Sequence, residues 1–234
     1  TLAMSIDNDK VTKIFCMADD FCRVYDRFVK VNGLAPKRDK SKRRYHRDGR
    51  LSDAEVITIM ILFHLGGYKC LKHFYLNEVC RNMTDLFPGL VSYNRFVELE
   101  RKVVVPFILF VNRCCMGACT GISFVDSTAL RVCRNQRIRL HKIFKGLAQR
   151  GQCSMGWFYG FKLHLICSEK GELLNFMLTP GNVDDRDPLR NKSFIERIFG
   201  KLVGDKGYIC SDLFSRLFVD GIQLITKLKS NMKG

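Results

Sequence analysis

The sequence lacks any apolar run long enough to cross a membrane. Its longest apolar stretches, 56–65 and 103–111, fall short of the roughly 18 residues that a membrane-spanning helix requires. A secretory signal is also missing from the N-terminus, where two aspartates and an asparagine occupy positions 7–9. We therefore expect a cytoplasmic protein that has no membrane partner.

The sequence holds eleven cysteines but no Cys-x-x-Cys motif, and its five histidines are scattered. A zinc site usually draws on closely spaced ligands, so none is expected even where three cysteines gather between 114 and 119. An odd number of cysteines without a secretory signal also argues against a disulfide framework. We expect reduced thiols that are mostly buried.

Acidic residues are scarce in two stretches where basic residues gather. The net charge is +16; segment 36–50 has eight lysines and arginines against two aspartates, and segment 131–150 has seven against no acid. Cations that neutralise phosphates release condensed counterions, so such blocks are typical of proteins that bind nucleic acid. Charge alone leaves open a solvated basic loop or contact with an anionic membrane surface.

The N-terminal part of the chain has the residue pattern of helices. Apolar residues recur at intervals of three and four within 1–35, which predicts one amphipathic helix, whereas 36–50 reads as a basic linker or arm. Ser52 and Glu55 form a capping box that begins a buried helix. Region 51–118 is helical and could hold a helix-turn-helix, or could equally be a plain bundle for packing or dimerisation.

From residue 122 the pattern changes to short runs of β-forming residues. Three runs predict an antiparallel meander, and two more, each preceded by a helix, predict right-handed crossover connections. Asp187 and Pro188 begin the first of these helices, which is expected to reach Phe199. The order predicts an α/β domain over 119–234, with a mixed five-stranded sheet and flanking helices. The predicted strands are 122–125, 157–167, 173–178, 202–203 and 223–226.

Two of the predicted strands end in an aspartate, Asp126 and Asp205. Magnesium prefers oxygen ligands and keeps several waters, so carboxylates that converge from neighbouring strands suit Mg²⁺, or Mn²⁺ in its place. Two such ions activate the attacking hydroxyl or water and stabilise the leaving oxygen of a phosphodiester. A single aspartate at a strand end is more often a turn or cap residue, but the pair on a basic chain favours a metal site.

Three sequence blocks resemble the DDE transposases of bacterial insertion sequences, whose RNase H-like core is shared with retroviral integrases. The blocks are Phe124–Thr128, Gly156–His164 together with Thr179–Asp185, and Leu202–Tyr208. The resemblance implies an enzyme, a polynucleotidyl transferase that hydrolyses a phosphodiester at the end of a mobile genetic element and joins the 3′-hydroxyl to target DNA. It also implies that Asp126 and Asp205 are catalytic metal ligands, the first two members of an acidic triad.

The resemblance further implies double-stranded DNA as the partner, both terminal inverted repeats and target DNA, with a homodimer assembled on it near the nucleoid. Basic residues beside the metal site would hold phosphates, which position a duplex without reading its sequence. Region 51–118 and the basic arm would recognise the element ends. His164 could also be an ordinary strand histidine that points to solvent or core. The predicted DNA-binding residues are Arg131, Arg134, Arg137, Arg139, Lys142, Lys162, His164 and Lys206.

Two features of these blocks have more than one interpretation. Trp157, Phe158, Tyr159 and Phe161 could stack on unpaired bases, although alternation along a strand explains most of them as core residues. Asp185, which follows the third strand, could cap the next helix.

The sequence departs from this class at its C-terminal end. A third carboxylate, usually a glutamate on a helix after the fifth strand, is expected there, but residues 227–234 contain no acid. Glu172 lies in a hairpin turn and Glu196 on an outer helix, so neither has the expected position. We expect a truncated chain that is weakly active or inactive alone. It could instead be a DNA-binding derivative that inhibits the full-length transposase, or an RNase H-like nuclease unrelated to transposition.

Overall fold

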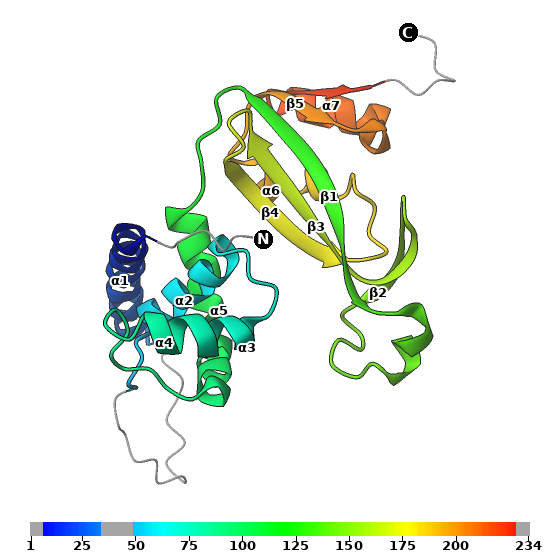
Figure 1. The fold of residues 1–234 in the computed structure, drawn as a ribbon. Coiled ribbons are helices and arrows are strands. Elements are labelled where there is room, and N and C mark those ends of the chain that lie inside the picture. Colours follow the sequence, from blue (N-terminus) through cyan, green and yellow to red (C-terminus); the bar gives the residue numbers. More distant parts are fainter. Residues whose placement is uncertain (1–6, 34–48, 228–234) are drawn as a thin grey trace. The chain divides into compact units, whose positions relative to one another are not determined.

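The computed structural model describes residues 7–33 and 49–227. The chain divides into two compact units, Thr1–Cys114 and Cys115–Gly234, the first helical and the second α/β (Figure 1). Most of the predicted basic arm at 36–50 lies outside the described residues.

The helices of the first unit share one apolar core. The capping box predicted for the second helix is confirmed: Ser52 N donates to Glu55 Oε2 (2.7 Å), and Glu55 N donates to Ser52 Oγ (3.2 Å). No helix in the described part of the chain combines the length and apolar character that a membrane crossing requires. The elements of this unit are α1 (Asn8–Val31), α2 (Asp53–Leu65), α3 (Leu71–Phe74), η1 (Tyr75–Val79), α4 (Cys80–Asn82) and α5 (Tyr93–Cys114).

The second unit is built on a six-stranded sheet within the described residues. Its helices are short, apart from the nine-residue α7. The strands are β1 (Ile122–Cys133), β2 (Gln149–Cys153), β3 (Gly156–Ser168), β4 (Leu173–Pro180), β5 (Gly200–Gly204) and β6 (Ile222–Thr226). The helical segments are η2 (Asn135–Leu140), η3 (Pro188–Arg190), α6 (Lys192–Ile195), η4 (Lys206–Tyr208) and α7 (Ser211–Val219).

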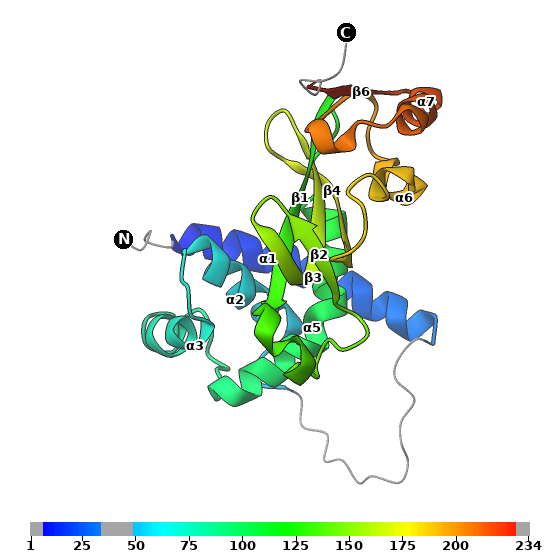
Figure 2. The ribbon, with the colours of Figure 1, turned by 90° about the vertical axis from the view of Figure 1, so that its right-hand side faces the viewer.

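The strand order is β2-β3-β1-β5-β6, and β4 pairs with β3. β1 is antiparallel to β3 but parallel to β5, and β5 is parallel to β6, so the sheet is mixed as predicted. Helices α6 and α7 lie on one side of it (Figure 2). Their buried residues Phe194 and Leu213 belong to one core with Val125, Ile166 and Leu202 from the sheet.

Three details differ from the prediction. The first strand, expected over 122–125, extends to Cys133 as β1, so Asp126 lies within it and not at its end. The basic segment 131–150, expected to connect two strands, contains the end of β1, the helix η2 and the start of β2. β2 is additional to the five predicted strands, so the sheet has six strands within the described residues. The single helix expected from Asp187 to Phe199 is broken, because Asn191 has an extended backbone (φ −88°, ψ 115°). The Asn191 side chain then accepts from Ser193 N (3.0 Å) and caps α6, so that two short helices replace one.

Candidate active site

The parallel pairing of β1 with β5 brings the two predicted catalytic aspartates together. Phe124 lies opposite Val203 in this pairing. Asp126 and Asp205 each follow two positions later, so they lie side by side where β5 ends. Asp205 directly follows β5, whereas β1 continues past Asp126 to Cys133, so Asp126 does not lie at the strand end that the sequence predicts. They line one pocket of about 320 Å³. The other residues that line it are Ser127, Ala129, Gln152, Cys153, Ser154, Lys162, Asp185 and Tyr208.

Both aspartates are exposed, and local backbone groups hold each of them. Asp126 Oδ1 accepts from Ser127 N (2.7 Å), and Asp205 Oδ1 accepts from Gly207 N (2.7 Å) at the start of η4. In each carboxylate the second oxygen has no protein hydrogen bond among the described residues. These oxygens can therefore take a ligand from solvent.

A third aspartate, Asp185, lines the same pocket. The sequence does not predict this position for Asp185. It does not cap a helix; its Oδ1 accepts from Ser127 Oγ (2.9 Å) and forms an ion pair with Lys162 Nζ (3.0 Å). The Lys162 ammonium also donates to the Val183 carbonyl (2.9 Å), and the residue is only 8% exposed. The pair fixes a positive group beside two carboxylates. The neighbouring Asp184 instead binds Arg186, which lowers the pKa of Asp184 to about 2.

Tyr208 contributes a hydroxyl that has no hydrogen-bond partner in the described part of the chain. The side chain is 2% exposed, and its ring packs closely on Gly204, where a Cβ atom would stand 3.0 Å from Tyr208 Cδ2. Burial raises the pKa of Tyr208, and the charges of Asp185, Asp126 and Asp205 raise it further. The nearby Ser127 side chain lowers it by less, because its geometry falls short of a hydrogen bond. The phenol therefore keeps its proton, and its buried oxygen is not accessible to a ligand in the pocket.

The structure corrects the prediction that His164 contacts DNA. Its side chain is 0% exposed, and its Nε2 is hydrogen-bonded to Thr179 Oγ1 (2.8 Å). Burial lowers the pKa of His164, so the ring is neutral near pH 7. A neutral ring without exposed surface has no access to a phosphate, and the alternative of a core histidine fits the structure.

The other predicted DNA-binding residues have different surroundings. Lys162 lines the pocket, and Lys206 is exposed in η4 directly after Asp205. The remaining cations are exposed along the end of β1, η2 and the residues that follow, and none has an ion-pair partner in the part of the chain that the structure describes. They are Arg131, Arg134, Arg137, Arg139 and Lys142.

The pocket suits a magnesium ion by its donor set. Mg²⁺ is often held by one or two carboxylates together with waters and substrate phosphates, and Asp126 and Asp205 can supply those carboxylates. Over residues 7–33 and 49–227, no group of three or more His, Cys, Asp or Glu side chains is placed to hold a metal ion. Residues 228–234, on which the predicted absence of a third carboxylate partly depends, lie outside the described residues.

A mixed sheet with this strand order, with one carboxylate within β1 and another directly after its parallel neighbour β5, defines the RNase H-like class of α/β domains. Within that class, the chain belongs to the family described as the transposase DDE domain, which matches residues 116–234. The match covers the whole sheet and every residue of the pocket. The predicted membership of the DDE transposase family is thereby confirmed.

Two solved structures are similar to the chain. The cryo-EM structure of the piggyBac transposase synaptic complex with hairpin DNA is 15% identical in sequence, with a TM-score of 0.48 over 97% of this chain and 49% of that one. The Mos1 transposase paired-end complex with the left transposon end is 11% identical, with a TM-score of 0.27 over 86% of this chain and 66% of that one. This chain thus spans about half the length of the piggyBac chain. Among curated proteins, no sequence matches it.

Proposed function

We propose that this chain carries the catalytic site of a transposase that cleaves a phosphodiester at the end of an insertion sequence and joins the 3′-hydroxyl to target DNA. The observation that carries the proposal is the convergence of Asp126 and Asp205 in one pocket of a transposase DDE domain. The two carboxylates would hold Mg²⁺, or Mn²⁺ in its place. When bound there, the ions would activate the attacking hydroxyl or water and stabilise the leaving oxygen.

Lys162 has a complementary role in this proposal. Held by Asp185, it places a positive charge where a non-bridging phosphate oxygen of the DNA would lie. This interaction positions the phosphodiester, because the ion pair and burial fix Lys162 before DNA binds.

The exposed arginines that follow the site on β1 and η2 would hold the DNA backbone. Their cations lie on the segment that begins beside Asp126, and no acid interrupts it. Such contacts fix the duplex relative to the pocket without reading its sequence. Recognition of terminal inverted repeats and the assembly of two chains on DNA belong to the proposal as well.

Cleavage of a labelled duplex that carries an element end tests the proposal in Mg²⁺ and in Mn²⁺. We expect the wild-type chain to nick and transfer strands weakly, and Asp126→Asn and Asp205→Asn to abolish both activities while DNA affinity is kept. Asp220→Asn is the matched control, because Asp220 is an exposed aspartate of the same unit outside the pocket. Cleavage by Asp126→Asn at the wild-type rate would refute the assignment. DNA binding without cleavage by the wild-type chain would favour the DNA-binding derivative.

A further inference from the structure

The aromatic residues at the start of β3 have very different exposures. Phe158 is 1% exposed and Tyr159 is 8% exposed, so both belong to the interior, and Phe161 is half-buried. Trp157, by contrast, is 59% exposed. It is also the single tryptophan of the chain. Trp157 is therefore not one of the aromatic residues that alternation along the strand explains as core.

A hydrogen bond joins Trp157 to the basic segment before it. The side chain of Asn135, in η2, donates from Nδ2 to the Trp157 carbonyl (3.0 Å). On the other side, Trp157 lies opposite Gln152 in the antiparallel pairing of β2 with β3. The indole is thus carried by a strand that is fixed on both sides rather than by a loop.

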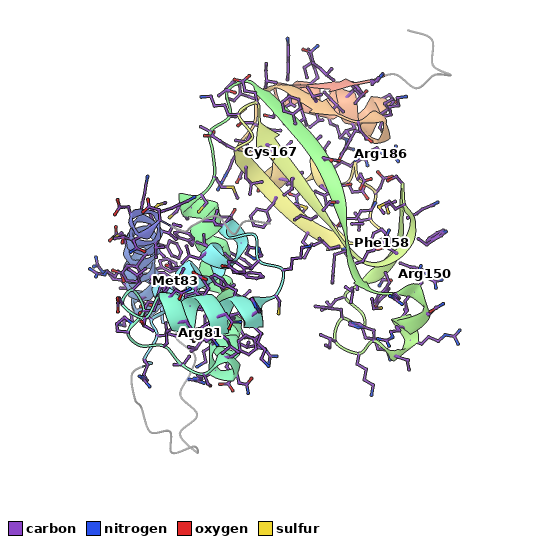
Figure 3. All side chains as sticks on the ribbon, viewed as in Figure 1. Arg81, Met83, Arg150, Phe158, Cys167 and Arg186 are labelled. Atoms are coloured by element: carbon purple, nitrogen blue, oxygen red, sulfur yellow. The ribbon has the colours of Figure 1, made fainter. Side chains whose placement is uncertain are left out.

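Two hollows flank Trp157 and Asn135. One, of about 290 Å³, is lined by these two residues together with Arg131, Arg134, Cys133 and Phe158. The other, of about 450 Å³, is lined by the two residues and Arg150. Figure 3 shows Arg150 and Phe158 at the same end of the sheet. An exposed aromatic ring therefore stands between spaces that arginines border.

These arginines carry uncompensated charge. Within the described residues, Arg131, Arg134 and Arg150 have no ion-pair partner, and the sequence from 131 to 150 contains no acid. Arg131 Nη2 lies 4.0 Å from Cys153 Sγ, and Cys153 also lines the pocket of Asp126. The contact between Arg131 and Cys153 thus links the hollow beside Trp157 to the pocket of Asp126. An anion with an attached planar group complements the surface around Trp157 in both charge and shape.

We propose that Trp157 and these three arginines form a binding site for an unpaired nucleotide of a DNA strand. The base stacks on the indole, and the arginines hold the phosphates on either side of it. Every base has a flat face, so stacking of this kind accepts any sequence, whereas a paired base inside a duplex cannot reach the ring. The inference rests on the proposed function only in taking DNA as the partner.

The single tryptophan allows a direct test on the whole chain. Trp157 emission is followed while the chain is titrated with a fully paired duplex and with the same duplex carrying a short unpaired segment. Anisotropy of a label on the DNA reports binding in parallel. We expect both DNAs to bind, but only the one with unpaired bases to quench the emission strongly.

Variants separate stacking from general DNA binding. Trp157→Ala is expected to weaken binding of the DNA with unpaired bases by about five- to 150-fold, the range measured for stacking of one base, and to keep the affinity for the paired duplex. Met155→Ala is the matched control, because Met155 is an 81% exposed apolar neighbour that lines neither hollow, and it should bind both DNAs as wild type does.

Three outcomes would overturn the inference while the proposed function stands. They are equal quenching by the two DNAs, an equal loss of affinity for both in Trp157→Ala, and quenching by an acidic peptide in place of DNA. Absence of anisotropy change with either DNA would instead refute DNA as the partner, and the inference would fall with it.

Discussion

Replacing Tyr208 with phenylalanine tests the candidate site without any DNA. The residue is 2% exposed, and its hydroxyl has no hydrogen-bond partner in the part of the chain that the structure describes. A buried polar group without a partner costs about 1–3 kcal/mol of folding free energy. We expect Tyr208→Phe to raise the free energy of unfolding by about 1 kcal/mol, which corresponds to about 2–4 °C in Tm for a chain of this size.

Tyr75 provides a control of opposite sign. It is 0% exposed, and its hydroxyl donates to the Val91 carbonyl at 2.7 Å. Tyr75→Phe leaves that carbonyl without its donor, so we expect the free energy of unfolding to fall by about 1 kcal/mol. The two substitutions remove the same atom from two buried rings, and only the hydrogen-bond partner differs.

Urea unfolding of the wild type and both variants measures these changes. Emission of Trp157 follows the α/β unit, and far-ultraviolet circular dichroism follows the helices as well. A loss of stability in Tyr208→Phe as large as that in Tyr75→Phe would refute the reasoning, because it would mean that the Tyr208 hydroxyl stabilises the fold.

Three further predictions concern the same unit. Lys162→Met should lower the free energy of unfolding by about 1–3 kcal/mol, because Asp185 loses its ion-pair partner. The double variant with Asp185→Leu should recover part of this loss. Fully additive losses of the two single variants in thermal unfolding would contradict the ion pair. His164 has a pKa lowered by burial, so its contribution to stability is present above about pH 6.5 and is lost as the pH falls through the folded-state pKa. Urea unfolding from pH 8 to 5 should therefore decline less steeply in His164→Gln than in the wild type, and parallel curves would argue against it. Arg131→Ala and Arg134→Ala should each reduce the slope of log affinity against log salt by about 0.9 in duplex binding, whereas unchanged slopes would exclude phosphate contacts.

The part of the site that the sequence predicts depends on local patterns. Asp126 and Asp205 each follow a short apolar run, and the alternation of strands and helices indicates that those runs become neighbours in a parallel pairing. The capping box at Ser52 is equally local, since its partner stands three positions away. Such features can be read directly because each is specified within a few residues.

The part that the sequence does not predict depends on contacts between distant segments. The position of Asp185 in the sequence is that expected of a helix cap. Only the folded chain places its Oδ1 2.9 Å from Ser127 Oγ and 3.0 Å from Lys162 Nζ. Nothing in the sequence indicates that the Tyr208 hydroxyl is buried without a partner. The sequence does not indicate the break at Asn191, because the extended backbone of this single residue, whose side chain caps α6, decides it.

The parallel pairing of β1 with β5 has a consequence for the stage of folding at which the candidate site forms. Asp126 and Asp205 are far apart in the sequence, so their meeting requires closure of a long loop that contains β2, β3, β4 and α6. A chain in which this pairing has not formed therefore holds the two carboxylates apart. Divalent metal that binds only the assembled pocket would also stabilise the folded unit by mass action, so calorimetric melting with and without Mg²⁺ would report completion of this topology.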